Sequence, residues 1–277
     1  MGGVGVSFDD QLAVHQQSLP DGQRRVVEVL LGDRGEAAFL PADEVARRAG
    51  VSVATTVRVA QRLGFDGYPA LRGALQRDLR TTLGQRLRDL PATDDVLATL
   101  LAREQSALSG VVSSIPESTI TAAATAVHCA DRVFISARGH SSAVAELLCR
   151  RLRRLGRPVI SLTGAGRDVA EALHLLTARD AVVAVALRRQ PPLLAAILRH
   201  AAKVGAATVV VSDAAGPLLR PRPDHLLASA RGVHNGYQTL VVPVLIAEAL
   251  ALAVARLDPA APAVLDGLER LIETLDR

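Results

Sequence analysis

The spacing of apolar residues changes once along the chain, near Asp131, and this change limits the possible folds more than any other feature. Before it, apolar residues recur every three or four positions, which is typical of helices. After it, short runs rich in valine and isoleucine alternate with helical segments. The pattern predicts an all-α N-terminal domain followed by an α/β domain whose parallel sheet is covered on both faces.

Five runs are expected to form the sheet. They are short and largely apolar, and the last is the weakest: residues 132–136 (RVFIS), 158–162 (PVISL), 180–187 (DAVVAVAL), 207–212 (ATVVVS) and 224–228 (DHLLA). Ligands of such sheets bind beyond the carboxyl ends of the strands. The segments that follow the first four strands are therefore the candidate ligand-binding loops.

The composition indicates a folded protein of the reducing cytoplasm. Hydrophobic residues make up 49% of the 277 positions and charged residues 22%, enough for one large core or two modest ones. The two cysteines lack the spacing of a metal site, so neither a metal nor a cofactor is expected. Neither a signal peptide nor a membrane span is expected, because the longest apolar stretch, residues 239–255, is short and contains Pro243 and Glu248.

Residues 41–65 (PADEVARRAGVSVATTVRVAQRLGF) are expected to form two short helices joined by a turn at Gly50. Residues 45–65 include four arginines and no acidic residue. Ser52 is a favourable N-cap for the second helix, which opens with short polar groups suited to the DNA major groove. The candidate DNA-binding residues are Arg47, Arg48, Ser52, Ala54, Thr55, Thr56, Arg58 and Arg62.

An alternative interpretation of the same segment is ordinary helix packing. Two short helices joined at a glycine occur in many all-α domains, and basic helix faces are commonly only solvated. Clustered arginines without acid favour the DNA-binding interpretation. We then expect base contacts from Ser52, Ala54, Thr55 and Arg58, and phosphate contacts from Arg47, Arg48, Arg62 and Arg72.

The two halves together resemble the RpiR family of bacterial transcriptional regulators, which join an N-terminal helix-turn-helix to a sugar-isomerase-type (SIS) ligand-binding domain. Residues 49–75 (AGVSVATTVRVAQRLGFDGYPALRGAL) follow the family's GVS turn, Ala-Thr, arginine and LGF-x-G-[YF]-x-x-L pattern, and residues 133–148 (VFISARGHSSAVAELL) resemble the first SIS strand and loop. The resemblance implies a helix-turn-helix domain at 1–82, a helical connector at 83–115 and an SIS domain at 116–277. That domain would contain a parallel sheet of about five strands flanked by helices.

The resemblance places Gly139 and Ser141 on the Gly-x-Ser of the first SIS loop, with His140 where serine is common. The loop after the third strand departs from the family. Sugar-phosphate-binding members have Ser-x-Ser-Gly-x-Thr there, whose hydroxyls and N–H groups hold phosphate at a helix N-terminus. This chain has ALRRQP at 186–191, without a hydroxyl, and Pro191 and Pro192 remove two backbone donors.

Arg188 and Arg189 could hold an anion instead, because guanidinium groups bind carboxylate and phosphate through paired hydrogen bonds. They could equally be solvent-exposed without a ligand, and Ser141 could merely cap the helix that follows. The candidate effector-binding residues are Gly139, His140, Ser141, Ser142, Thr163, Arg188, Arg189 and Asn235.

These features predict a DNA-binding transcriptional regulator whose SIS domain senses a small anionic metabolite, a sugar phosphate or a sugar acid. A homodimer or a dimer of dimers is expected to bind a palindromic operator, with residues 103–112 and 239–255 as candidate interface helices. The alternative is an SIS-type sugar-phosphate isomerase. Isomerisation needs a base near the substrate C–H, and no pair of histidine or glutamate residues has a spacing that indicates acid–base catalysis, so no catalytic residue is assigned.

Overall fold

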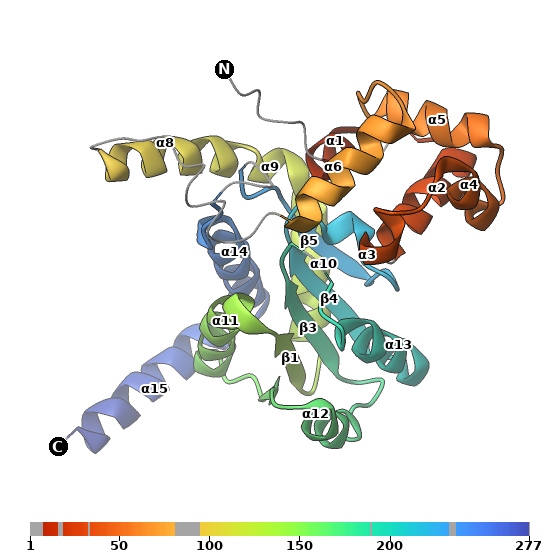
Figure 1. The fold of residues 1–277 in the computed structure, drawn as a ribbon. Coiled ribbons are helices and arrows are strands. Elements are labelled where there is room, and N and C mark those ends of the chain that lie inside the picture. The colour runs from red at the N-terminus through yellow and green to blue at the C-terminus, as the bar shows by residue number, and fades with distance from the viewer. Residues whose placement is uncertain are drawn as a thin grey trace. The chain divides into compact units, whose positions relative to one another are not determined.

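The computed structural model describes residues 8–15, 19–32, 34–80, 95–188, 190–232 and 237–276. The chain divides into two compact units, Met1–Val96 with Gly232–Gln238, and Leu97–Arg231 with Thr239–Arg277. Figure 1 labels most of the helices and strands of both units. Among the helices that the structure describes, none combines the length and the apolar character needed to cross a membrane.

The first unit is helical in all of its described secondary structure. Its helices are α1 (Phe8–His15), α2 (Asp21–Gly32), α3 (Arg34–Ala37), α4 (Ala42–Ala49), α5 (Val53–Arg62) and α6 (Tyr68–Arg80). Their apolar faces form one core, in which Phe8, Leu30, Leu63 and Leu71 are fully buried. Tyr68 adds a polar link, because its hydroxyl donates a hydrogen bond to the carbonyl of Leu40 (2.9 Å).

The second unit begins with helices and continues with alternating strands and helices. The elements are α8 (Val96–Ser109), α9 (Val111–Ser114), α10 (Glu117–His128), β1 (Val133–Ala137), η2 (Gly139–Ser141), α11 (Ser142–Arg154), β2 (Val159–Leu162), α12 (Gly166–Leu173), β3 (Ala181–Ala186), α13 (Leu194–Val204), β4 (Ala207–Ser212), η3 (Gly216–Leu218), β5 (His225–Ala228), α14 (Val241–Leu257) and α15 (Ala261–Leu275).

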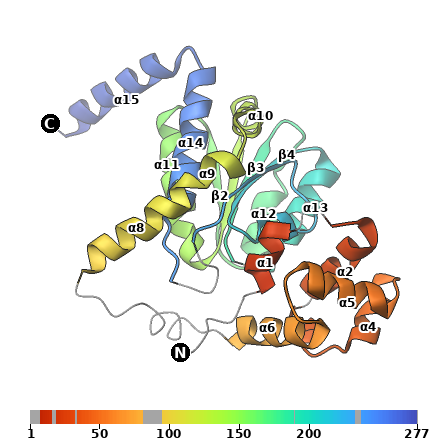
Figure 2. The same cartoon turned by 90° about the horizontal axis from the view of Figure 1, so that it is seen from above.

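The five strands form one parallel sheet in the order β2-β1-β3-β4-β5. Successive strand residues point to opposite faces. Val133, Ile135 and Val183 pack with α10, α11 and α14, whereas Phe134 and Val182 pack with α12 and α13. Figure 2 shows these two helical layers on either side of the sheet. The predicted α/β fold with five parallel strands is confirmed.

The amino ends of β1 and β3 are joined by a buried carboxylate. Asp180 accepts hydrogen bonds from Arg132 Nε (3.0 Å), from Arg132 Nη2 (2.8 Å) and from the Thr177 N–H and hydroxyl (2.7 and 2.8 Å). Burial alone would raise the pKa of Asp180, but these hydrogen bonds hold the pKa below its usual value. These bonds fix this end of the sheet, and the opposite end carries the candidate ligand-binding loops.

Candidate DNA-binding surface and effector site

The turn between α4 and α5 has the geometry of a helix-turn-helix. Gly50 ends α4 in the left-handed region (φ +62°), which glycine adopts without steric cost. Arg25 of α2 donates from Nε to the carbonyl of Ala49 (3.0 Å) and from Nη2 to that of Gly50 (3.4 Å). These bonds satisfy carbonyls that α4 leaves without a helical partner, and they fix where α5 begins.

Helix α5 is capped as its sequence predicts. Ser52 Oγ accepts a hydrogen bond from the Thr55 N–H (3.3 Å) and lies 3.0 Å from the Thr55 hydroxyl. The cap satisfies one backbone donor of the first turn. Both hydroxyls lie at the N-terminal end of α5, which is the end of a recognition helix that contacts base edges in many helix-turn-helix proteins.

One side of α5 is exposed and carries three of the eight predicted DNA-binding residues. Ala54, Arg58 and Arg62 follow one another at four-residue spacing and are all exposed. Arg58 Nε donates to the carbonyl of Ala54 (3.2 Å), so the arginine lies along its own helix. Val53 is 45% exposed beside them. Val53 was not among the residues predicted from the sequence, although an exposed apolar side chain there suits a thymine methyl group.

Thr56 is a correction to the predicted DNA-binding set. Its side chain is fully buried, and with Val59, Ala60 and Leu63 it forms the inward face of α5. The spacing of these four positions, i, i+3, i+4 and i+7, was the signal in the sequence that assigns Thr56 to the core. Its hydroxyl oxygen has no hydrogen-bond partner.

Replacing Thr56 with valine therefore tests the orientation of α5. Valine has nearly the same shape and removes a buried hydroxyl that makes no hydrogen bond, so we expect the free energy of unfolding to stay equal or to rise by about 1 kcal/mol. DNA affinity should not change. Chemical denaturation and a gel-shift titration measure the two quantities, and a loss of DNA affinity at unchanged stability would contradict the burial of this side chain.

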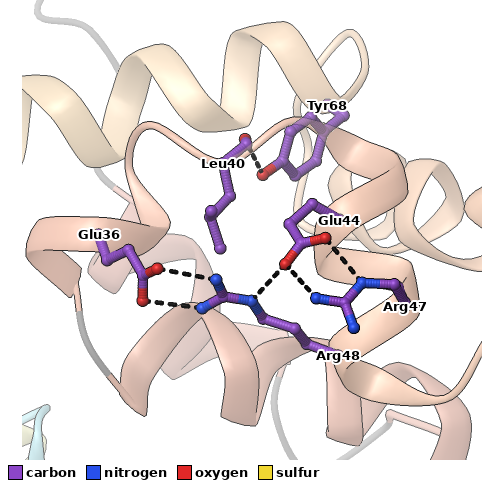
Figure 3. A network of polar contacts seen from close by, with 6 residues as sticks. All are labelled: Glu36, Leu40, Glu44, Arg47, Arg48 and Tyr68. Atoms are coloured by element: carbon purple, nitrogen blue, oxygen red, sulfur yellow. Dashed lines mark hydrogen bonds and ion pairs between the residues drawn. The ribbon is translucent and has the colours of Figure 1, made fainter.

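Two predicted phosphate contacts, Arg47 and Arg48, are engaged within the domain (Figure 3). Arg47 donates to both oxygens of Glu44 (2.8 and 2.6 Å). Arg48 donates from Nε to Glu44 (2.8 Å) and from Nη1 and Nη2 to the two oxygens of Glu36 (2.7 Å each). The guanidinium group of Arg48 thus joins α3 to α4.

These contacts lower the pKa of Glu44 to about 2, through hydrogen bonds first from Arg47 and then from Arg48. A hydrogen bond from Arg48 also lowers the pKa of Glu36. A carboxyl with a lowered pKa stabilises the folded state above its usual pKa and loses that effect only as the pH falls toward the lowered value. The four-residue network therefore stays ionised near neutral pH.

The network changes the charge argument made from the sequence. Glu36 and Glu44 precede the acid-free stretch of residues 45–65, and their two negative charges balance Arg47 and Arg48. Arg58 and Arg62 have no ion pair with a described residue. Of the four arginines of α4 and α5, those without an ion pair to a described residue therefore lie on α5.

In the second unit, the strand order indicates where a ligand would be expected to bind. β2 lies on one side of β1 and β3 on the other, so the chain reverses its direction of winding between β1 and β3, where open α/β sheets bind ligands. Gly139 (φ +59°), His140 and Ser142 follow β1 and are exposed, whereas Ser141 is buried. The Ser141 side chain makes no capping hydrogen bond to α11, so the capping alternative is not realised.

Arg138 links the loops that follow β1 and β2, and it was not among the effector-binding residues predicted from the sequence. Its Nη2 donates to the carbonyl of Gly164 (2.7 Å), next to the exposed Thr163. The residue directly follows β1, which was the signal available in the sequence. It places a cation among the predicted effector-binding residues of both loops.

The loop after β3 is tied to the protein by a buried carboxylate. Arg188, with a positive φ of +67°, donates its N–H to Asp213 Oδ2 (2.8 Å). The same oxygen accepts from Arg231 Nε (2.9 Å) and Nη2 (2.6 Å), and Oδ1 accepts from the Ala215 N–H (3.1 Å). Arg231 also donates to the carbonyl of Thr239 (3.0 Å). Asp213 therefore holds together the loops after β3, β4 and β5 and the segment that leads into α14.

A second link fixes the same loop. Gln190 Nε2 donates to the carbonyl of Arg220 (2.6 Å), and the Arg220 N–H donates to Gln190 Oε1 (2.8 Å). The Arg188 N–H is thus bonded to a protein carboxylate, where a phosphate-binding loop would present such a group to its ligand. Two other predicted effector residues, Arg189 and Asn235, lie outside the described residues.

Comparison with known proteins identifies both units. Residues 7–82 match the family model of the helix-turn-helix domain of the rpiR family, and residues 126–253 match that of the SIS domain. The chain belongs to the RpiR family. The resemblance seen at residues 49–75 and 133–148 is confirmed.

Individual relatives agree with this assignment. The uncharacterized HTH-type transcriptional regulator YfhH of Escherichia coli K12 is 26% identical over 147 residues, 50% of this chain and 52% of the relative, so the match spans about half of that protein. The sugar isomerase domain of an RpiR transcription factor from Sphaerobacter thermophilus is 28% identical, with a TM-score of 0.58 over 64% of this chain and 99% of that one. NanR of Vibrio vulnificus, solved with ManNAc-6P, has the same fold (18% identity, TM-score 0.59, 97% and 99% covered).

Proposed function

We propose that this RpiR family member is a transcriptional regulator in which α5 binds operator DNA and the SIS domain binds a small anionic metabolite. The observation that supports DNA binding best is the exposed face of α5. Ala54, Arg58 and Arg62 line that face, behind an N-terminus capped by Ser52. Side chains at the start of such a helix contact base edges, and arginines further along contact bases or phosphates.

A homodimer is the proposed DNA-binding form. Two recognition helices related by a two-fold axis bind inverted half-sites about one helical turn apart, so the operator would be palindromic. An effector would change operator affinity by binding more tightly to one arrangement of the two recognition helices than to the other. Whether the effector strengthens or weakens operator binding follows from which arrangement it favours.

The proposal is tested by selecting genomic DNA fragments with the purified full-length protein and footprinting the enriched sequences. We expect protection of a palindrome, with an affinity that falls steeply as salt rises, because phosphate contacts release counterions. Recovery of fragments without a common sequence, or protection without two-fold symmetry, would contradict specific binding by a dimer.

The effector site that we propose lies at the carboxyl ends of β1 and β2. Gly139, His140 and Ser142 are exposed after β1, Thr163 is exposed after β2, and Arg138 joins the two loops. A guanidinium beside hydroxyl groups can hold a phosphate or a carboxylate. The loop after β3 makes a smaller contribution, because Asp213 already accepts its Arg188 N–H.

Replacing Arg138 with methionine should remove binding of the anion. A ligand at about one hundred times its Kd stabilises the folded protein by about 2.7 kcal/mol, so a sugar phosphate or sugar acid that raises Tm in the parent protein should cause little or no shift in this variant. Arg199→Met, on the exposed side of α13, is the matched control and should keep the full shift. If the ligand raises the Tm of the Arg138 variant as much as that of the parent protein, the anion binds at another site.

The same ligands separate the regulator from the alternative, a sugar-phosphate isomerase. A regulator binds the effector without changing it, whereas an isomerase interconverts aldose and ketose. NMR spectra of each sugar phosphate, recorded over hours with the purified protein, should show no new sugar signals. Turnover at a rate proportional to the protein concentration would favour the enzyme.

A further inference from the structure

The guanidinium group of Arg25 is only partly used within the helical unit. Arg25 lies on α2, which packs against both α4 and α5 (Figures 1 and 2). Its Nε and Nη2 donate to the carbonyls of Ala49 and Gly50 (3.0 and 3.4 Å), whereas its Nη1 bonds to no residue that the structure describes. The residue is exposed. Arginine has five N–H donors in a planar fork, so the Nη1 side of this group remains available to an acceptor outside the protein.

The first turn of α2 lies beside the start of α5. The position that a Cβ atom on Gly22 would take is 3.7 Å from Val51 Cγ1 and 3.9 Å from Thr55 Cγ2. Arg25 follows one turn later on the same side of α2, because residues three apart on a helix are neighbours. This side of α2 therefore flanks the end of α5 that we propose to contact base edges.

An element that flanks this end of α5 would lie beside the DNA backbone. The major groove is about 12 Å wide, and an α-helix with its side chains is about 10–12 Å across. A helix in the groove therefore has a row of phosphates close to each of its sides. Phosphate oxygens accept short, charge-assisted hydrogen bonds from guanidinium groups. The exposed part of Arg25 has the charge and the donors that such a phosphate needs.

Without Arg25, the turn after α4 would repel a phosphate. The carbonyls that Arg25 binds lie at the C-terminal end of α4, where the aligned peptide dipoles leave about half a negative charge. The guanidinium group covers them with a positive charge. Asp21 and Glu28 are the acids one turn away on either side along α2, but Asp21 pairs with Arg24 (3.3 Å) and neither makes an ion pair with Arg25. The positive charge of Arg25 is therefore not balanced by a carboxylate of its own helix.

We infer that Arg25 is a further DNA contact, whose Nε and Nη2 hold the turn while its Nη1 donates to a phosphate beside the bases that α5 contacts. One guanidinium group then both positions the recognition helix and anchors it to the DNA backbone. A phosphate contact of this kind fixes the register of a protein on DNA without distinguishing base sequences. The inference rests on the proposed binding of operator DNA by α5, and it adds α2 to the DNA-binding surface.

Two substitutions separate the charge of Arg25 from its hold on the turn. Arg25→Gln and Arg25→Lys both lose the planar fork that binds two carbonyls, but only the glutamine variant loses the charge. Fluorescence anisotropy measures the affinity of the full-length protein for operator and for random duplex DNA at several salt concentrations. Arg25→Gln should reduce the slope of log K against log salt by about 0.9 on both DNAs, which is the value for one phosphate contact. Arg25→Lys should keep the parent slope.

Arg24→Gln is the matched control. Arg24 precedes Arg25 on α2, is also exposed and already pairs with Asp21, so its replacement should leave the parent slope unchanged. Urea denaturation checks that each variant folds, and both Arg25 variants should show a similar fall in the midpoint. If Arg25→Gln is destabilised but keeps the parent slope, Arg25 only caps α4 and the inference is wrong. An equal fall in slope for Arg24→Gln would also overturn it.

Neutral phosphates in the operator identify the group that Arg25 contacts. Each phosphate near the half-site is replaced in turn by an uncharged methylphosphonate. At one position the replacement should weaken binding of the parent protein roughly eightfold near 0.1 M salt and leave binding of Arg25→Gln unchanged. If every replacement weakens both proteins equally, Arg25 contacts no phosphate. A parent protein that binds no specific operator would instead refute the proposed function, on which this inference depends.

Discussion

Replacing Asp213 with alanine is expected to destabilise the SIS domain by about 3–5 kcal/mol, because it leaves a buried arginine without its counter-ion. The side chains of Asp213 and Arg231 are 2% and 3% exposed, so water cannot replace the lost carboxylate. Two further donors, the N–H groups of Arg188 and Ala215, lose their acceptor in the same step. Urea denaturation followed by circular dichroism measures the change.

Two controls separate the buried charge from other effects. The double variant Asp213→Leu with Arg231→Met removes both charges, and we expect it to be more stable than Asp213→Ala, because replacement of a buried ion pair by apolar groups often costs little. Glu146→Ala removes an exposed pair with Arg150, which should cost no more than about 1 kcal/mol. If Asp213→Ala were as mild as Glu146→Ala, the carboxylate would not hold the loops together.

The strands were predictable because a parallel sheet buries both faces of each strand. Such strands stand out as continuous apolar runs, and Ala207–Ser212 was located to the residue. α12 was not foreseen, because its sequence GRDVAEAL is short, contains three charged residues, and buries only Val169 and Leu173. α15 has a clear helical period but lies beyond the part of the chain that the RpiR resemblance covers.

The candidate sites were predictable where they depend on neighbouring residues. Ser52 caps α5 as expected, because N-capping is decided within four residues. The contacts of Arg48 with Glu36 and of Asp213 with Arg231 join residues 12 and 18 positions apart, through turns whose geometry the sequence does not specify. Those pairings depend on the tertiary structure. Arg48, predicted as a phosphate contact, instead links α3 to α4 through Glu36.

Replacing Arg58 with alanine should lower affinity for the operator about 10- to 100-fold, the loss of about 1–3 kcal/mol that follows removal of one specific base contact. Arg58 is exposed on α5 and has no ion pair with a described residue, so in the complex its guanidinium can turn from the Ala54 carbonyl to a base edge. Discrimination between operator and random DNA should fall with the affinity. Gel-shift titrations on both DNAs, at two salt concentrations, measure each quantity.

Arg62 and Arg47 provide the matched variants for this experiment. Arg62→Ala should weaken binding to operator and random DNA equally and reduce the salt slope by about one, as expected of a phosphate contact. Arg47→Ala should have the smallest effect of the three, because Arg47 already pairs with Glu44 in the protein alone and must give up that pair to contact DNA. If Arg47→Ala lowers operator affinity more than Arg58→Ala does, the main DNA contact lies on α4 and not on α5. The assignment of α5 as the recognition helix would then be wrong.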